Sequence, residues 1–504
     1  MTFSLWQNVP FACVLLPLFG AAVGSALPRK AARAWAALLI AAVVGLSCWF
    51  MAEMSASGEA YAYPMGHFPA PWGNELRAGP LEALLGLMFS LLTLICLVGG
   101  GKRLETDITP GRQGLYHSVL LLMLSALMAQ VYTNDLFTAY VFVEIMTIAG
   151  CGLIAVRASK GQALVSAVRY MVMNLIGSAL FLLGIILLYD LTGHLLMPNL
   201  KESVAALAAA GEYELPLTVV VALLCTGLAC KSALFPFHTW VPDAYSAGTP
   251  TSTALLASLV SKSYIVLIVK VILRVIGREV ILGTHVCDIL FCFGAAGMLA
   301  GSIAAIRTRD ARRMIAWSSV AQIGYIFMGI GLATEAGMAA ALFHIVSHAA
   351  AKSLLFLSVE PLSDASGGRG SVEHLRGAGF RAPLAGAAFT AGALSVTGLP
   401  LLGGFVSKLL LGSAAAAQGG ARGWIGLASL AVSTLLNVMY MVRTVLVIWS
   451  HPSQENEPPL REPARRPGLR LTVALIVLMA ANVGLFLFAS PIAETLREGL
   501  AVFG

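Results

Sequence analysis

Seven ionisable side chains lie inside stretches of sequence that are otherwise apolar enough to cross a membrane. They are Glu144, Lys231, Lys262, His344, His348, Lys352 and Lys408. Placing one charged side chain at the centre of a membrane-spanning helix costs about 2.5–3.5 kcal/mol even on a lenient scale. Because ionisable groups at this depth usually mark the path of an ion or a proton, we expect these groups to have a function.

The spacing of three of these groups predicts one polar helix face. His344, His348 and Lys352 recur every four residues in "LFHIVSHAAAKSLLFL", so their side chains share one side of a helix. Glu144 has no basic residue one helical turn away, so its partner must come from another helix. Lys231 is the obvious candidate.

A lysine within a turn of the membrane surface can instead extend its ammonium group into the headgroup region. We assign this behaviour to Lys270 and Arg274, which are left out of the predicted path. Extension of the ammonium group to the membrane surface is also the alternative for Lys231, Lys262 and Lys408. Their positions within the apolar windows make this alternative less favoured than a place on the path.

Two prolines predict interruptions of membrane helices beside two of the lysines. Pro236 follows Lys231, and Pro400 precedes Lys408 in the glycine-rich segment "TGLPLLGGFVSK". A proline removes a helical hydrogen bond. An interrupted helix frees backbone carbonyl and amide groups, which can bind water or an ion when they line a cavity. Each break is therefore predicted to form part of a site.

The residue types favour proton movement over other chemistries. The proton affinity of a lysine changes with its distance from a carboxylate, so a Glu–Lys pair can act as a switch. A solute site would be expected to show aromatic residues around a cavity. The His344/His348 pair has no carboxylate or thiolate ligand near it in the sequence, and the eight cysteines are not spaced as metal ligands are. No phosphate loop, dinucleotide fingerprint or iron–sulfur pattern occurs, so we expect no metal, cofactor or catalytic redox site.

The elements that position these groups are predicted to be membrane helices. The chain has 504 residues, of which 58% are apolar and 11% charged, and its mean hydropathy is +0.84. In lipid only helices and closed barrels satisfy their own backbone, so apolar windows of this length predict an all-α polytopic protein. We expect about fourteen spans, at 7–27, 33–52, 80–100, 114–131, 135–156, 165–189, 216–235, 251–276, 284–306, 313–332, 336–360, 382–411, 422–449 and 469–489.

The charge distribution predicts the orientation of these spans. Arginine and lysine gather in alternate loops, as the positive-inside rule requires of the cytoplasmic side, so both termini are expected in the periplasm. The net charge of +7 then reflects loop residues, and no nucleic-acid partner is expected. Residues 11–27 are interpreted as a retained span, because a basic segment and a cleavage site are missing before Arg29.

The predicted breaks lie in spans seven and twelve, which are five spans apart. A five-span unit that is repeated once must appear upside down the second time, so spans 4–8 and 9–13 are candidate inverted repeats. This divides the chain into three N-terminal spans at 1–113, repeats at 114–277 and 278–449, and a polar loop with the last span at 450–504.

Three segments resemble a known family of membrane proteins. They are "CKSALFPFHTWVPDAYSAGTPTSTALLASLVSK", "RRMIAWSSVAQIGYIFMGIG" and "FHIVSHAAAKSLLFL". The family is that of the antiporter-like proton-channel subunits of respiratory complex I (NADH:quinone oxidoreductase), Mrp sodium/proton antiporters and energy-converting hydrogenases. The resemblance runs from about residue 114 to 443. It implies fourteen helices, two inverted five-helix repeats, and interruptions in helices seven and twelve.

The resemblance also assigns proton-transfer roles to residues of this chain. The family's helix-five glutamate corresponds to Glu144, and its lysines in helices seven and eight correspond to Lys231 and Lys262. Its helix-eleven histidine corresponds to His348, with His344 and Lys352 nearby. Its ionisable residue in helix twelve corresponds to Lys408. Asp243, in "WVPDAY", matches a family position at the end of the broken helix, and a helix-capping role is its alternative.

The function implied by this resemblance is that of a proton-translocating subunit of a larger redox-driven or antiporter complex. Its partners would be other membrane subunits in a bacterial inner membrane, and any oxidoreductase activity would belong to the complex. Lys408, and a chain that ends soon after its last span, favour the D-type antiporter subunit or the shorter complex I members. The alternatives are Mrp-type sodium/proton exchange through the same residues, and a scaffold subunit that conducts nothing.

Overall fold

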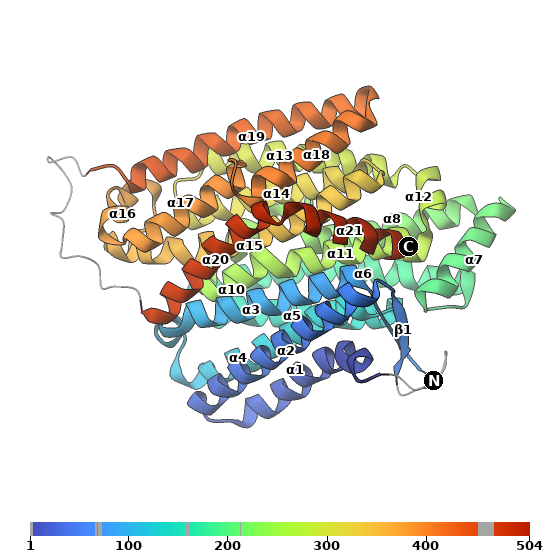
Figure 1. Cartoon of the computed structure of the whole chain (residues 1–504), viewed down its shortest axis with the longest axis horizontal. Helices are drawn as coiled ribbons and strands as arrows, with labels where there is room; N and C mark the ends of the chain where they lie inside the picture. The colour runs from blue at the N-terminus through green and yellow to red at the C-terminus, as the bar shows by residue number, and fades with distance from the viewer. Residues whose placement is uncertain are drawn as a thin grey trace.

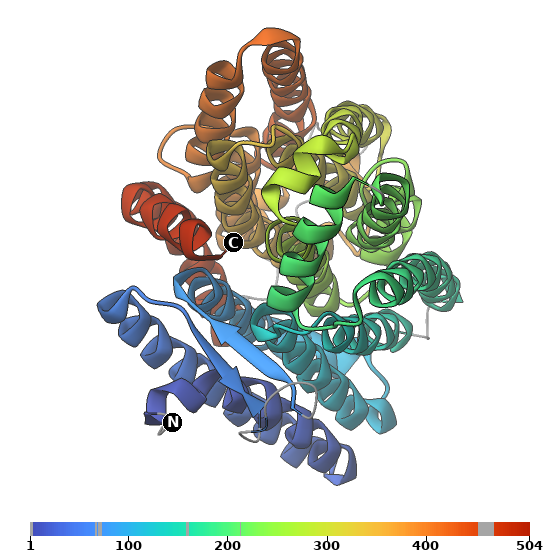
Figure 2. The same ribbon diagram turned by 90° about the vertical axis from the view of Figure 1, so that its right-hand side faces the viewer.

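The protein is an elongated bundle of helices that run roughly along one direction (Figure 1) and are seen close to end-on in Figure 2. The computed structural model describes residues 4–65, 68, 73–157, 161–211, 213–451 and 468–503. Among the described residues, 13 helices are long and apolar enough to cross a membrane. The prediction of an all-α polytopic membrane protein is therefore confirmed.

The first part of the chain contains one short hairpin and eight long or interrupted helices. The elements are η1 (Leu5–Asn8), α1 (Val9–Ala26), α2 (Arg29–Ser57), β1 (Tyr61–Pro64), β2 (Glu75–Ala78), α3 (Pro80–Asp107), η3 (Pro110–Arg112), α4 (Gln113–Tyr132), α5 (Leu136–Ala155), α6 (Gly161–Thr192), α7 (Met197–Ala210), α8 (Glu214–Ser232), η4 (Phe237–Trp240), α9 (Val241–Ala247), α10 (Pro250–Leu255), η5 (Leu256–Val260), α11 (Ser261–Lys270) and η6 (Val271–Ile276).

The second part of the chain is helical in every described element. The elements are α12 (Arg278–Gly283), α13 (Val286–Arg307), α14 (Ala311–Gly331), α15 (Glu335–Ala365), η7 (Val372–Leu375), α16 (Ala378–Arg381), α17 (Pro383–Thr397), α18 (Gly403–Gln418), α19 (Gly420–Ile448), α20 (Leu469–Leu487) and α21 (Ala489–Phe503).

The seventh predicted span is interrupted, but its helix ends earlier than the sequence suggests. The prediction placed the break at Pro236, whereas α8 already ends at Ser232 and Ala233 adopts a left-handed conformation with φ of 64°. In a continued helix Pro236 would lack the amide that bonds to the carbonyl of Ser232, and its ring would clash with that carbonyl, so the helix ends four residues before the proline. Lys231 consequently lies in the last turn of α8, beside its free carbonyls.

The twelfth predicted span, 382–411, is present as two helices with a break between them. α17 ends at Thr397, and α18 begins at Gly403. Gly398 closes α17 with φ of 86°, a conformation that favours glycine, so this break also begins before its proline, Pro400. Neither helix alone has spanning length, which accounts for 13 long helices where about fourteen spans were predicted.

The eighth span is continuous but irregular. Two π-helical segments, η5 and η6, flank α11 within the span Pro250–Ile276. A π-helical turn places each amide opposite the carbonyl five residues earlier, and such turns are frequent at functional sites. Sequence periodicity does not reveal them.

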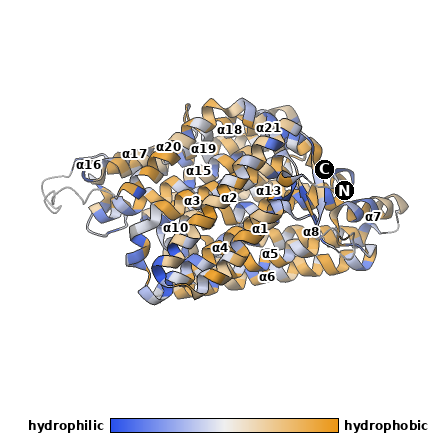
Figure 3. Cartoon of the chain, turned by 60° about the horizontal axis from the view of Figure 1, so that its bottom comes forward, coloured by the Kyte–Doolittle hydropathy of each residue, from blue (hydrophilic) through white to orange (hydrophobic). Residues whose placement is uncertain are grey.

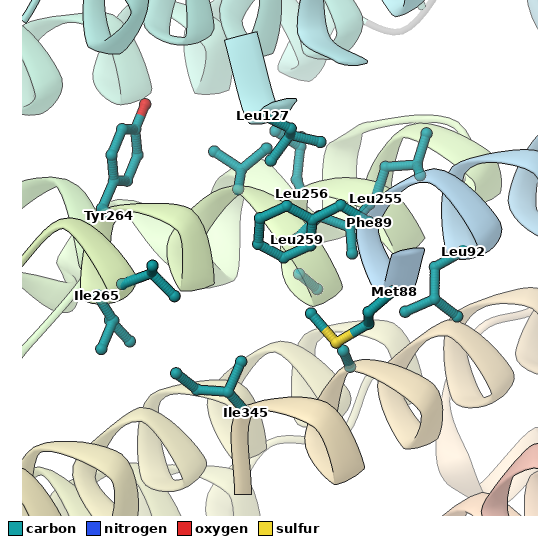
Figure 4. Close-up of a cluster of buried hydrophobic side chains, with 14 of the residues drawn as sticks. Met88, Phe89, Leu92, Leu127, Leu255, Leu256, Leu259, Tyr264, Ile265 and Ile345 are labelled. Atoms are coloured by element: carbon teal, nitrogen blue, oxygen red, sulfur yellow. The ribbon is translucent and has the colours of Figure 1, made fainter. Parts of the chain in front are cut away.

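The bundle has an apolar outer surface and a tightly packed centre. Hydrophobic residues cover the length of the helices, while hydrophilic residues gather toward the two ends (Figure 3). Met88 and Phe89 of α3, Leu127 of α4, Leu259 of η5 and Ile345 of α15 meet in the interior (Figure 4). In lipid such close packing, rather than escape from water, holds helices together. α15 lies at the centre of this packing, since its most apolar stretch is completely buried.

Both ends of the described chain lie at the same end of the bundle (Figures 1 and 2). The hydroxyl of Tyr61 in β1 donates to the carbonyl of Gln7, 3.0 Å away. Arg77 in β2, which pairs with β1, donates through Nη1 to the carbonyl of Phe503 at 2.9 Å. The short hairpin therefore joins η1, which precedes α1, to the end of α21.

Candidate ion-translocation path

Glu144 and Lys231 form the first part of the candidate site. The ammonium nitrogen of Lys231 on α8 lies 3.4 Å from Oε1 of Glu144 on α5, so the predicted partnership is present. Lys231 also donates to Oγ1 of Thr147 at 2.7 Å, and Ser178 on α6 donates to the same oxygen of Glu144. Lys231 is fully buried, whereas the side chain of Glu144 is 23% exposed.

Lys262 lies at the start of α11 and is fully buried. Its ammonium group donates to the carbonyl of Ala257, within the π-helical segment η5, and to Oγ of Ser261 at 3.2 Å. The carbonyl of Ala257 in η5 thus accepts a hydrogen bond from the amino group of Lys262, whether that group is charged or neutral. No described carboxylate lies within ion-pair distance of Lys262.

Lys352 occupies the central helix α15, where it too is fully buried. It donates to the carbonyl of Ile315 at 2.8 Å and to Oγ of Ser318, both on α14. Nearby, the hydroxyls of Ser258 in η5 and Ser353 in α15 lie 2.9 Å apart. Polar groups therefore connect the eighth, tenth and eleventh spans at this point.

His344 and His348 stack on one another along α15, as their spacing predicted. Their ring centroids are 5.9 Å apart and the ring planes differ by 5°. Nδ1 of His344 is 2.9 Å from Oγ of Ser407 on α18. Both ring nitrogens of His348 are buried without a hydrogen-bond partner in the described part of the chain. A buried imidazole without partners is costly unless water or a moving proton reaches it.

Lys408 ends the row of ionisable groups. It belongs to α18 but donates back to the carbonyl of Thr397, the last residue of α17, at 3.0 Å. Its ammonium nitrogen also lies 3.3 Å from Oγ1 of Thr434 and 5.0 Å from the ring centroid of Tyr325. The ammonium group therefore faces the negative end of the α17 dipole across the break.

These side chains form one row across the middle of the bundle. Lys262 is close enough to interact electrostatically with His344, His348 and Lys352, and Lys408 with His344. Within the described residues, Lys231 is the one lysine of the row that has a carboxylate partner. The structure thus brings Glu144 to Lys231, and it gathers Lys262, His344, His348, Lys352 and Lys408 into a second group. The link between the two groups is α11, because the ammonium nitrogen of Lys231 lies 5.6 Å from the ring centroid of Tyr264 on that helix.

Asp243 lies apart from this row, at the basic end of the bundle. Its two carboxylate oxygens meet Arg169 of α6 at 2.5 Å and Arg313 of α14 at 3.0 Å. It is in the first turn of α9, yet its carboxylate bridges two other helices. A polar cavity of about 760 Å³ borders these three residues.

The prediction that Lys270 and Arg274 extend to the membrane surface is wrong. Both are buried, and Lys270 donates to the carbonyls of Gln130, Val131 and Thr133 at the end of α4. Arg274 contacts Glu82 and Asn134. The carbonyls at the end of α4 offer Lys270, and the side chains of Glu82 and Asn134 offer Arg274, a better position than the membrane surface would.

Some polar partners were not foreseen from the sequence. Tyr325 stacks on His344 with centroids 5.5 Å apart, and its hydroxyl meets Thr434 and Asn437 at 3.2 Å each. His238, just after Pro236, is buried and stacks on Phe235. A tyrosine or serine in an apolar helix gives no sequence signal of which helix it faces. The only available signal was the position of His238 within a predicted break.

Comparisons with known proteins agree with this geometry. Residues 133–436, more than half of the chain, match the family described as NADH:quinone oxidoreductase/Mrp antiporter, TM. The chain belongs to this family. The matched segment includes every member of the row from Glu144 to Lys408. The resemblance noted in the sequence is therefore confirmed.

Relatives of this antiporter-like membrane protein resemble it over most of their length. It is 34% identical over 479 residues to NADH-quinone oxidoreductase subunit N of Desulforudis audaxviator, which covers 93% of each chain. It is 28% identical to a Na(+)/H(+) antiporter subunit of Bacillus subtilis, over 86% of this chain and 85% of that one. A chain of the Mrp complex from Dietzia sp. DQ12-45-1b shares the fold, with a TM-score of 0.87, 24% identity and coverage of 99% and 97%.

Proposed function

We propose that the chain moves protons across a membrane as one subunit of a larger complex, through the row from Glu144 to Lys408. The observation that carries this proposal is the row itself. Lysines and histidines from several helices are buried in a bundle with an apolar surface, and Lys262 is close enough to interact electrostatically with His344, His348 and Lys352. Groups that can gain and lose a proton, placed at such spacing, are what a proton relay requires.

Uptake is proposed at the basic end of the bundle, through the polar cavity that Asp243, Arg169 and Arg313 border. From there a hydrated path would reach Lys231 and Lys262. Transfer would continue past His348 and His344 to Lys408 and leave at the opposite end. The basic end would face the cytoplasm and both termini the periplasm, in keeping with the positive-inside rule.

The Glu144–Lys231 pair is proposed to control the first transfer. When the carboxylate lies close, it stabilises the protonated lysine; when partner subunits draw it away, Lys231 releases its proton toward Lys262. The single contact at 3.4 Å and the partial exposure of Glu144 support a pair that can separate. Ser178, which donates to Glu144, is placed to hold the carboxylate when Lys231 is neutral.

Replacement of Lys231 by alanine tests this proposal. The complex that copurifies with the chain would be reconstituted into proteoliposomes, and proton uptake followed with a pH-sensitive dye. We expect Lys231→Ala to abolish most of the proton flux through this subunit, because the relay loses its first carrier. Lys201→Ala, on α7 outside the spans, is the matched control and should leave the flux unchanged. Wild-type flux in a fully assembled Lys231→Ala complex would instead indicate a scaffold.

Sodium/proton exchange is the second candidate, and it has one observation in its favour. A relative from Bacillus subtilis is named as a sodium/proton antiporter subunit. Hard cations need several oxygen ligands, whereas the described residues of the row include one carboxylate, Glu144. Sodium-dependent proton flux that is lost in Glu144→Gln would favour exchange over proton transfer alone.

The two broken helices are further proposed to belong to inverted repeats, with spans 4–8 at 114–277 and spans 9–13 at 278–449. The regions 1–113 and 450–504 would flank them. In support, the interruptions after Lys231 and before Lys408 have a similar form, in which a left-handed residue closes the first helix. Two such units would form two half-channels that meet near Lys262 and His348.

A further inference from the structure

A cavity at the basic end of the bundle, about 450 Å³ in volume, has no role in the proposed proton path. It lies between α2, α3, α4 and α20, and none of these four helices carries a member of the ionisable row. Basic side chains and apolar side chains such as Leu97 and Val98 both line it, together with Gln113 and His117. Leu97 and Val98 lie within the spanning part of α3.

The rim is strongly basic. Arg29, Lys30 and Arg33 come from the start of α2 and Arg470 from the start of α20, while Glu105 is the one carboxylate among the lining residues. Glu105 forms an ion pair with Arg33. The lining therefore carries a net charge of +3, of which Arg29, Lys30 and Arg470 have no described acidic partner. This charge complements an anion with more than one negative oxygen.

Two helix ends add to this positive field. α2 begins at Arg29 and α20 at Leu469, and neither helix has a side chain that caps its first amides. The free amides and the positive dipole ends of both helices point toward the membrane surface beside the cavity. Basic side chains and helix N-termini together form a favourable environment for a phosphate group.

Gly101 of α3 leaves room for the side chains of Arg33 and Arg470 to approach one another. A Cβ atom on Gly101 of α3 would lie 3.3 Å from Nη2 of Arg33 and 3.4 Å from Cδ of Arg470. The two side chains, separated by most of the chain in sequence, thus converge over a residue without a side chain. Below them, Leu97 and Val98 continue along α3 into the apolar span.

We propose that this cavity binds an anionic phospholipid, with its phosphate between Arg33, Arg470 and Arg29 and its acyl chains along α3. Basic pockets between membrane helices are known to select such headgroups. A free phosphate ion would use the rim but would gain nothing from the apolar wall. The inference does not depend on the proton path, since none of its residues belongs to that path.

Native mass spectrometry of the purified full chain tests this site. The delipidated protein would be titrated with dioleoylphosphatidylglycerol or with dioleoylphosphatidylcholine, which differ in net charge but not in acyl chains. We expect phosphatidylglycerol to be retained preferentially, and the Arg29→Gln/Arg470→Gln variant to retain it about tenfold more weakly. Arg278→Gln/Arg497→Gln removes two arginines that line a different cavity, and should bind like the wild type.

A second variant separates charge from shape. Gly101→Leu keeps every arginine but fills the space where Arg33 and Arg470 converge, so we expect it to lose phosphatidylglycerol as well. Millimolar inorganic phosphate should displace little of the bound lipid. Equal retention of both lipids, full displacement by phosphate alone, or unchanged binding in both cavity variants would each overturn the proposal.

Discussion

Three lysines of the row share an unusual chemical environment. The hydrogen-bond partners of Lys262, Lys352 and Lys408 among the described residues are backbone carbonyls and hydroxyls, all of them neutral. Neutral acceptors hold an ammonium group in place without binding its proton as strongly as a carboxylate does. In the proposed relay these three lysines would pass a proton on, whereas Lys231, with its carboxylate, would control its release.

Tyr325 is expected to assist transfer between His344 and Lys408. Its ring lies against both groups, and its hydroxyl joins Thr434 and Asn437. Tyr325→Phe keeps the ring and should reduce proton flux by about two- to tenfold, because a neutral hydrogen bond contributes about 0.5–1.5 kcal/mol and about 1.4 kcal/mol is a factor of ten. Tyr325→Leu removes the ring as well and should reduce flux more. Equal flux in both variants and the wild type, measured in proteoliposomes, would contradict this role.

Lys270 is expected to stabilise the fold rather than to carry protons. In Lys270→Ala the carbonyls of Gln130, Val131 and Thr133 lose their shared donor. Leaving a buried polar group unsatisfied costs about 1–3 kcal/mol, so the variant should unfold at a lower temperature in detergent. The correctly folded fraction should keep its proton flux per complex. Loss of flux without loss of thermal stability would assign Lys270 to the path instead.

At the scale of the element, the two interrupted helices place their lysines in a similar way. Lys231 is in the last turn of α8, and Lys408 reaches back from α18 to the last carbonyl of α17. In both cases an ammonium group lies at the negative end of a half-helix within the membrane. The first half-helix of each pair therefore positions the lysine, and the break keeps its carbonyls available.

Gly398 is the residue on which the second break depends. Its φ of 86° is a backbone conformation that is strained for any residue other than glycine. A Cβ atom at this position would also lie 2.8 Å from Cδ of Lys408. Gly398→Ala should therefore lower thermal stability by about 1–3 kcal/mol and displace Lys408, so that proton flux falls. Gly484→Ala, in α20 where nothing lies within 4 Å, is the matched control. Unchanged flux in a destabilised Gly398→Ala protein would argue against this coupling.

The features that could be predicted correctly from the sequence are those that the geometry of a single helix determines. The four-residue spacing of His344, His348 and Lys352 fixed their common face, because helix geometry alone determines it. The exact start of each break was not predictable, since it depends on left-handed residues such as Ala233. The burial of Lys270 was missed because its partners lie on α4, far away in sequence. The inverted relation of the two repeats stays a prediction.

At the scale of the whole molecule, the bundle separates two kinds of charged group. The row of lysines and histidines lies in the interior, whereas arginine–carboxylate clusters lie at the end of the bundle. At that end Glu360 of α15 meets Arg103, Arg157 and Arg312 within 2.8–3.6 Å. These clusters join α3, α14 and α15 with Arg157, which follows α5, and join α6 and α9 with α14, so they tie together the helix ends around the proposed uptake cavity.

We propose that protons pass through the buried row and that its two halves meet at Lys262. The most direct test is the number of protons moved per turnover by the reconstituted complex, compared between wild type and Lys262→Ala. We expect the variant to assemble normally but to move fewer protons per turnover, by the share this subunit contributes. A Lys262→Ala complex that assembles and moves as many protons as the wild type would contradict it.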